Sequence, residues 1–184
     1  MQNEESNPWQ TLNTSIGYEN PWIKVQHNEV LNPSGKPGIY GVVHFKNLAI
    51  GVIPLDSENN TWIVGQYRYA LNQYSWEIPE GGGKIGVDPL DSAKRELLEE
   101  CGLIAHKWEK IMEMHLSNST TDEHSLVYVA RDLEHTESEP EETEQLIIKK
   151  IPFEELYQMV KRGEVTDGIS VAAVLKVKLM MVGL

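Results

Sequence analysis

Three glutamates, Glu96, Glu99 and Glu100, stand close together in a segment of the 184-residue chain that is rich in helix-forming residues. At 3.6 residues per turn, Glu96 and Glu100 share one face of the predicted helix, and Glu99 flanks them. On a partly buried face, carboxylates about 5–6 Å apart repel by about 3 kcal/mol at an effective dielectric near 20, so a counter-ion is needed. Hard oxygen ligands on one ridge suit Mg²⁺ or Mn²⁺. The alternative is a solvated acidic face, where like charges cost only about 0.5 kcal/mol.

A glycine cluster leads into this helix. Gly81–Gly83 is followed by Gly86, and a turn of this kind can cradle phosphate oxygens with its backbone N–H groups. Asp88 is the predicted N-cap, Pro89 occupies the first helical position, and Gly102 is the predicted stop. The pattern therefore predicts a phosphate-binding turn followed by a helix over 90–100 that carries metal ligands.

The segment Arg95–Leu103 resembles the second half of the Nudix box, and Gly81 stands fourteen residues before Arg95, where the Nudix hydrolase superfamily places its opening glycine. The resemblance implies that Glu96, Glu99 and Glu100 bind Mg²⁺ or Mn²⁺. It also implies that the backbone carbonyl of Glu80 is a further ligand.

One position departs from the box. The family usually has a glutamate at the position of Val87, where it pairs with the box arginine, here Arg95. Asp88, the next residue, is the candidate substitute. Glu77 is either another partner for Arg95 or a substrate ligand.

The resemblance extends beyond the box to the ADP-ribose pyrophosphatases and related nucleoside-diphosphate-sugar hydrolases. The similar segments are Gln66–Ala70, Trp76–Gly81, Ser117–Ser125, Glu142–Glu144 and Arg162–Val165. This likeness implies Mg²⁺-dependent hydrolysis of the diphosphate bond of a nucleotide sugar, giving a nucleoside monophosphate and a sugar phosphate. Asn118 stands where the ADP-ribose-specific pattern has proline, so GDP-mannose and other nucleotide sugars stay open beside ADP-ribose.

Two loop glutamates are candidates for the general base. Glu142 is the first choice, and Glu144 is then an additional metal ligand; a positioned base contributes about 10²–10⁴-fold to the rate. Glu123 is the competing base and otherwise contacts the substrate. The six glutamates between 134 and 144 are equally typical of a solvated loop.

Three other side chains are predicted to bind the substrate. Arg68 can hold a phosphate or ribose with its planar guanidinium, although a surface cation at a strand end is the alternative. Trp22 or Tyr18 can stack on the base, either within one subunit or from a partner subunit, whereas core or dimer packing is the commoner use of such aromatics. Glu77 completes the predicted substrate-binding set.

The overall composition narrows the class of protein. A formal net charge of −12 argues against nucleic-acid binding, because nucleic-acid-binding proteins usually carry a basic stripe. The polar, acidic start does not resemble a signal peptide, and Lys176 and Lys178 interrupt the longest apolar stretch, so we expect a cytoplasmic protein with no membrane contact. The single cysteine, Cys101, is predicted to be a small semi-buried residue rather than a catalytic thiol.

The elements that must position these groups alternate between strands and helices. We expect an α/β (α+β) fold in which helices cover a mixed sheet, the α/β/α sandwich implied by the Nudix resemblance. A small N-terminal antiparallel β domain over 1–44, with residues 1–20 as a lead-in or docking arm, is expected to precede a Nudix domain over 45–184 and to build a homodimer. The predicted strands are 22–30, 39–45, 48–54, 61–67, 110–115, 126–130 and 147–151, and helices over 153–162 and 169–181 follow.

Two other functions fit parts of the pattern. One is a Nudix-fold sensor that binds ADP-ribose or another nucleotide without catalysis, which Val87 and Asn118 favour slightly and the complete Arg95–Glu100 segment disfavours. The other is a hydrolase of nucleoside triphosphates or dinucleoside polyphosphates, against which the Trp76–Gly81 segment and the N-terminal extension argue.

Overall fold

The computed structural model describes residues 6–136 and 146–183 and divides into two compact units. The N-terminal unit comprises Met1–Asn47 together with Ser117–Glu123, and the larger unit comprises Leu48–Leu116 and His124–Leu184. The domain boundary after residue 44 and the roles assigned to the two predicted domains stay predictions.

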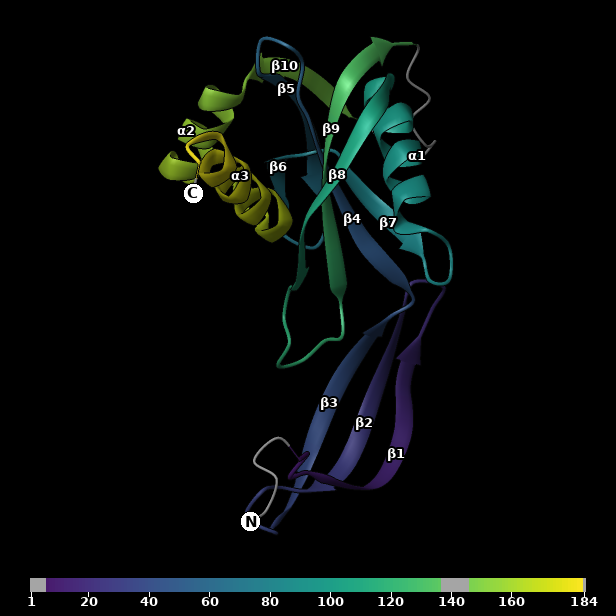
Figure 1. Cartoon of the computed structure of the whole chain (residues 1–184). Helices are drawn as coiled ribbons and strands as arrows, with labels where there is room; N and C mark the ends of the chain where they lie inside the picture. Colours follow the sequence, from purple (N-terminus) through teal and green to yellow (C-terminus); the bar gives the residue numbers. More distant parts are fainter. Residues whose placement is uncertain (1–5, 137–145, 184) are drawn as a thin grey trace. The chain divides into compact units, whose positions relative to one another are not determined.

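The N-terminal unit is a three-stranded antiparallel sheet in the order β1-β2-β3 (Figure 1). Its strands are β1 (Gln10–Glu19), β2 (Ile23–Leu31) and β3 (Pro37–Phe45). Within the segment expected as a lead-in or docking arm, Gln10–Glu19 forms a strand that pairs with β2 along its whole length. The alternation of Leu12, Thr14, Ile16 and Tyr18 is the period of a strand, although every residue of β1 is exposed.

A loop distant in sequence belongs to this unit. The backbone of Ser117–Glu123 bonds to β3, with Val43 N donating to Thr120 O at 2.9 Å and Asp122 N donating to Val43 O at 3.3 Å. The Asp122 carboxylate also accepts from Phe45 N at 2.8 Å. These bonds tie the predicted substrate loop to the third strand.

The larger unit contains two sheets, in the orders β10-β5-β6 and β7-β4-β9-β8. The second sheet is mixed, since β4 runs parallel to β9 and β8 runs antiparallel to it. The strands of the two sheets together are β4 (Asn47–Pro54), β5 (Asn60–Arg68), β6 (Gln73–Glu77), β7 (Glu80–Lys84), β8 (Leu103–His115), β9 (His124–His135) and β10 (Ile147–Pro152). The glycine cluster, expected as a loop, lies in β7, and β8 begins well before the predicted residue 110.

Helix α1 (Pro89–Cys101) lies on one side of these strands, and α2 (Phe153–Arg162) and α3 (Gly168–Met181) lie on the other (Figure 1). Side chains of a strand alternate between two faces, and the two hydrophobic cores follow this rule. Val52 packs with the α1 residues Ala93 and Leu97, whereas the next residue, Ile53, packs with Leu156 and Ala173 of α2 and α3. The predicted α/β fold with a mixed sheet, preceded by an antiparallel sheet, is confirmed.

The ends of α1 are those that the sequence predicts. The Asp88 side chain accepts from Leu90 N at 3.0 Å, Pro89 opens the helix, and Gly102 closes it in the left-handed conformation at φ 61°. Cys101 is buried at the last helical position, and burial raises the pKa of its thiol far above the ordinary value, which argues against a reactive thiolate. None of the helices in the described part of the chain has the length and apolar character needed to cross a bilayer.

Candidate active site

Helix α1 presents two of its three predicted metal ligands to the interior. Glu96 is 7% exposed and Glu100 is 2% exposed, and Glu99 lies at an intermediate position. The solvated-face alternative is therefore wrong for Glu96 and Glu100, because carboxylates on a solvated face would not be buried to this extent. Buried carboxylates require hydrogen bonds or positive charge to offset their lost hydration.

Part of that positive charge comes from Arg95, on the same helix. Its guanidinium contacts Glu96 and Glu99 at 2.5 Å each and donates to the carbonyl of Gly82 at 2.9 Å. Asp88, expected as the partner of Arg95, instead caps the helix, so that expectation is wrong. The guanidinium contacts only two of the three predicted ligands, and this local excess of negative charge favours a cation.

The first glycine of the cluster allows β7 and α1 to approach each other. A Cβ atom at Gly81 would overlap the carboxylate of Glu96. Next to it, Glu80 N donates to Glu100 Oε2 at 3.0 Å. The start of β7 therefore packs directly against the carboxylates of α1, and glycine at position 81 leaves room for Glu96 in its observed position.

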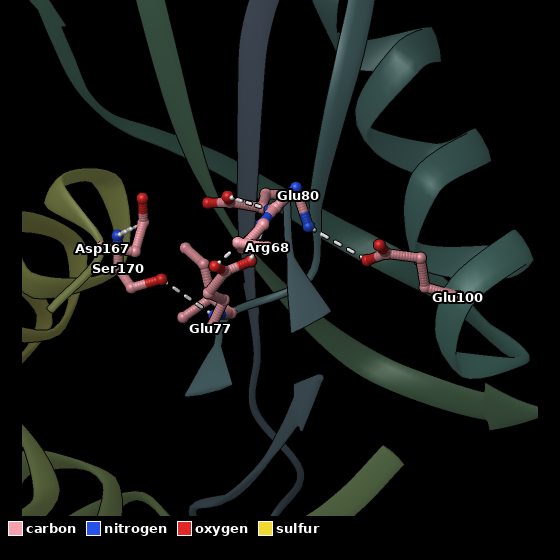
Figure 2. Close-up of polar contacts among 7 residues, drawn as sticks. Arg68, Glu77, Glu80, Glu100, Asp167 and Ser170 are labelled. Atoms are coloured by element: carbon pink, nitrogen blue, oxygen red, sulfur yellow. Dashed lines mark hydrogen bonds and ion pairs between the residues drawn. The ribbon is translucent and has the colours of Figure 1, made fainter. Parts of the chain in front are cut away.

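A second cluster joins Arg68, at the end of β5, to two glutamates (Figure 2). Arg68 Nε donates to both carboxylate oxygens of Glu77 at 2.9 and 3.0 Å, and its Nη2 bonds to Glu77 and, at 3.0 Å, to Glu80 Oε1. Burial alone would lower the pKa of Arg68, but Glu77 and Glu80 raise it above the ordinary value. Glu77, a candidate partner of Arg95, is thus bound to Arg68 instead.

The carboxyl group of Glu80 is in an unfavourable environment. Its Oε2 atom is buried and has no hydrogen-bond donor among the residues that the structure describes, and the carboxylate of Asp167 lies close to it. Burial raises the pKa of Glu80 well above its ordinary value, and the charges of Asp167 and Glu77 raise it further. Such a group is costly for folding, and groups of this kind concentrate at functional sites.

Asp167 was not among the predicted site residues. It caps α3 by accepting from Ser170 N at 2.7 Å, and the Ser170 hydroxyl in turn accepts from Ile78 N at 3.0 Å (Figure 2). The sequence Asp167-Gly168-Ile169-Ser170 has the spacing of a helix N-cap, which could have indicated the cap. Nothing in that pattern indicates that the cap lies beside Glu80, because the two residues are far apart in sequence.

The remaining predicted site residues lie outside the two clusters described above. Trp22 and Glu123 belong to the N-terminal unit, and Trp22 is 65% exposed, which excludes a role in that unit's core. Glu142 and Glu144 lie outside the described residues. Their roles, like those of the other predicted site residues, stay predictions.

The carboxylates around α1 have the donor chemistry that Mg²⁺ prefers. Within residues 6–136 and 146–183, no three histidine, cysteine, aspartate or glutamate side chains already converge as a metal-binding group. Arg95 holds Glu96 and Glu99 in this arrangement. The oxygen donors and their burial nevertheless fit a hard divalent cation.

Comparison with known proteins connects this geometry to a family. Residues 45–172, more than half of the chain, match the NUDIX domain, and residues 9–43 match the nucleoside diphosphate sugar hydrolase N-terminal domain. The chain is 29% identical over 180 residues to an ADP-ribose pyrophosphatase of Mycobacterium tuberculosis, covering 95% of this chain and 86% of the relative. It is 30% identical over 166 residues to a methanol dehydrogenase activator of Bacillus methanolicus, covering 89% of each.

A solved structure has the same fold. The crystal structure of an ADP compounds hydrolase superposes with a TM-score of 0.84 and covers 95% of this chain and 96% of that one. The sequences are only 19% identical, so this likeness concerns the fold alone.

Proposed function

Because the chain belongs to the NUDIX domain family and is a hydrolase of that family, we propose that it hydrolyses the diphosphate bond of nucleoside-diphosphate sugars. ADP-ribose, GDP-mannose and similar compounds are the candidate substrates, and a nucleoside monophosphate and a sugar phosphate are the products. The observation that carries the proposal is the burial of Glu96 and Glu100 against the start of β7. The match of residues 9–43 to a nucleoside diphosphate sugar hydrolase domain supports this substrate class.

The proposed cofactor is Mg²⁺, with Mn²⁺ as a substitute. Glu96, Glu99, Glu100, the backbone carbonyl of Glu80 and Glu144 are the proposed ligands. When bound, a divalent cation neutralises the diphosphate and polarises the phosphoryl oxygens. An acidic protein needs such help, because the carboxylates of α1 would otherwise repel the anionic substrate.

Arg68 is the proposed phosphate or ribose ligand. Its Nε and Nη2 atoms bond to Glu77 and Glu80, and its Nη1 atom has no acceptor among the residues that the structure describes. The guanidinium is therefore held in one orientation while one nitrogen stays available for an anion. Arginine binds phosphate well because its planar group presents several N–H donors at once.

In the proposed reaction a water oxygen attacks one phosphorus, and the bond from that phosphorus to the bridging oxygen breaks. The attacking water passes a proton to a glutamate, and the second phosphate leaves with the bridging oxygen. Glu142 is the first candidate for this base and Glu123 is the second. The variants Glu142→Gln and Glu123→Gln discriminate between them, since loss of the base reduces the turnover number by about 10²–10⁴-fold.

The test is a panel of nucleotide sugars incubated with the protein and Mg²⁺, with the products identified by chromatography. We expect ADP-ribose or GDP-mannose to yield the nucleoside monophosphate, and removal of the metal by a chelator to stop the reaction. Tight calorimetric binding without product would replace the proposal with the sensor. Preferred cleavage of nucleoside triphosphates or dinucleoside polyphosphates would replace the substrate class.

The N-terminal unit is proposed to form a homodimer contact. Five large apolar side chains of this unit are more than half exposed, which is typical of an interaction surface: Leu12, Ile16, Tyr18, Trp22 and Ile39. Trp22 is also the proposed stacking partner of the base. Sedimentation equilibrium of the wild type and of Ile16→Glu tests this, since a charge in the contact is expected to produce monomers. A cytoplasmic location stays a prediction.

A further inference from the structure

The connection between β6 and β7 is held by three different elements, and Figure 2 shows the contacts with Ser170 of α3 and Glu100 of α1. Ile78 N donates to the Ser170 hydroxyl of α3 at 3.0 Å, and Pro79 O accepts from Val52 N of β4 at 2.9 Å. Glu80 N then donates to Glu100 Oε2 of α1 at 3.0 Å. Three consecutive residues thus connect the helix that begins at Gly168 with the helix that carries the proposed metal ligands.

Ser170 is placed so that its hydroxyl serves this connection. The residue is fully buried, and its own N–H donates to the cap residue Asp167 at 2.7 Å, which fixes the first turn of α3. Ile78 is fully buried as well, so its N–H depends on a protein acceptor. The hydrogen bond between them therefore sets how far Ile78 lies from α3.

The link from Ile78 to Glu80 is stiff. Pro79 lies between them, and a proline ring fixes its own φ near −65° while restricting the residue before it. Fewer backbone rotations are consequently available to absorb a displacement of Ile78 before it reaches Glu80. Glu80 N in turn meets the carboxylate of Glu100.

We propose that Ser170 is a positioning residue of the active site, whose hydroxyl fixes Ile78 and thereby sets the position of Glu80 against Glu100. This role rests on the proposed function, because Glu100 and the carbonyl of Glu80 are its proposed metal ligands. Ser170 contacts neither substrate nor metal; it acts through the Ile78–Glu80 segment.

The chain offers a matched control for the loss of this hydroxyl. Ser125, in β9, is fully buried like Ser170, but its hydroxyl has no hydrogen-bond partner within residues 6–136 and 146–183. Ser125→Ala and Ser170→Ala therefore remove the same atom from equally buried sites, and only the second removes an acceptor from the backbone. Ser170→Thr keeps the hydroxyl and serves as the conservative rescue.

The experiment measures Mn²⁺ binding to each folded protein without substrate, by the loss of the free-ion electron paramagnetic resonance signal, and then kcat and KM. We expect Ser170→Ala to weaken Mn²⁺ binding by about 10–100-fold, as is usual when a group that orients a ligand is lost. Its kcat should fall more than its KM rises at saturating metal. Ser125→Ala and Ser170→Thr should bind Mn²⁺ as the wild type does.

Unchanged Mn²⁺ affinity in folded Ser170→Ala, beside an active wild type, overturns the positioning role and leaves the proposed function intact. A wild type that neither binds Mn²⁺ nor cleaves nucleotide sugars overturns both. If Ser170→Ala does not fold, Ser170→Cys takes its place, because a thiol of similar size is a weaker acceptor. An intermediate loss of affinity in that variant supports the role, and wild-type affinity overturns it.

Discussion

Two carboxylates of the larger unit have opposite environments. Asp56, in the turn between β4 and β5, accepts hydrogen bonds from Glu58 N at 2.9 Å, Asn60 N at 2.8 Å and Lys150 Nζ at 2.7 Å. Burial alone would raise its pKa, but these donors lower it below the ordinary 3.8. Glu80 has a single guanidinium on one side, and burial beside Asp167 raises its pKa.

The difference separates a carboxylate that supports folding from one that opposes it. The turn supplies Asp56 with backbone donors from residues two and four positions away, and Lys150 of β10 adds the opposite charge, so the carboxylate is fully compensated. Glu80 instead lies beside two carboxylates, Glu77 and Asp167, and only tertiary structure brings Asp167 close to it. Proteins keep a destabilising buried carboxyl of this kind where it serves a functional site. The proposed metal ligands next to Glu80 are the candidate reason for keeping it here.

The variant Glu100→Gln tests most directly whether the carboxylates beside Glu80 bind a metal ion. The amide oxygen can still accept from Glu80 N, whereas the charge that a cation needs is gone. We expect kcat/KM for the best nucleotide sugar to fall by at least about 100-fold, since even residues that only orient a ligand cost 10–100-fold. Glu109→Gln, an exposed glutamate on β8, is the control. Equal activity of the two variants would contradict the assignment.

Gly81→Ala tests whether the space beside Glu96 is needed. The new Cβ would overlap that carboxylate, so either β7 or Glu96 must move. We expect kcat/KM to fall by about 10–100-fold through misplaced ligands. Gly41→Ala, whose Cβ would meet no atom of the described part of the chain within 4 Å, should leave steady-state kinetics unchanged. Wild-type kinetics in Gly81→Ala would show that the close approach is not required.

Asp56→Ala tests the stabilising carboxylate. We expect the free energy of unfolding near pH 7 to fall by about 1–3 kcal/mol, because hydrogen bonds to an ionised group are lost. Since the folded pKa of Asp56 is depressed, its contribution is present above the ordinary 3.8 and is lost as the pH falls from 3.8 towards the lower folded value. The difference between wild type and variant, measured by urea denaturation, should therefore shrink in acid. A constant difference would assign the effect to packing.

Glu80→Gln should have the smallest effect and the opposite sign. The amide keeps an acceptor for Arg68 and removes a charge that Asp167 and Glu77 oppose, so we expect a gain of about 0.5–2 kcal/mol in the free energy of unfolding above neutral pH. A raised folded pKa means that the wild type loses stability as the pH rises above the ordinary 4.5, whereas the variant does not. The gain should hence grow with pH in the same urea titrations. A loss at alkaline pH would mean that the ion pair with Arg68 outweighs the repulsion.

Local signals made much of the larger unit predictable. Asp88, Pro89 and Gly102 determine both ends of α1 through capping and proline geometry, which act within a few residues. The 3.6-residue period likewise placed Glu96 and Glu100 on one face, and both are buried there.

The contacts that could not be predicted connect residues distant in sequence. No local pattern indicates that Arg68 holds Glu77 and Glu80, or that Asp167 lies beside Glu80. Strand β7 was missed because a run of glycines has low strand propensity, and its pairing with β4 determines the conformation instead. Such elements are decided by tertiary packing, which a single sequence does not reveal.

The loop Ser117–Glu123 means that the N-terminal unit is built from two separate stretches of the sequence. Because it belongs to the N-terminal unit, the polypeptide passes between the units after residues 47, 116 and 123 instead of once. A version of the protein that begins at Leu48 would retain this loop without the backbone of Val43 that it bonds to. The N-terminal unit cannot be cut away cleanly by truncation, and complementary fragments divided at that junction are expected to reassociate and co-elute.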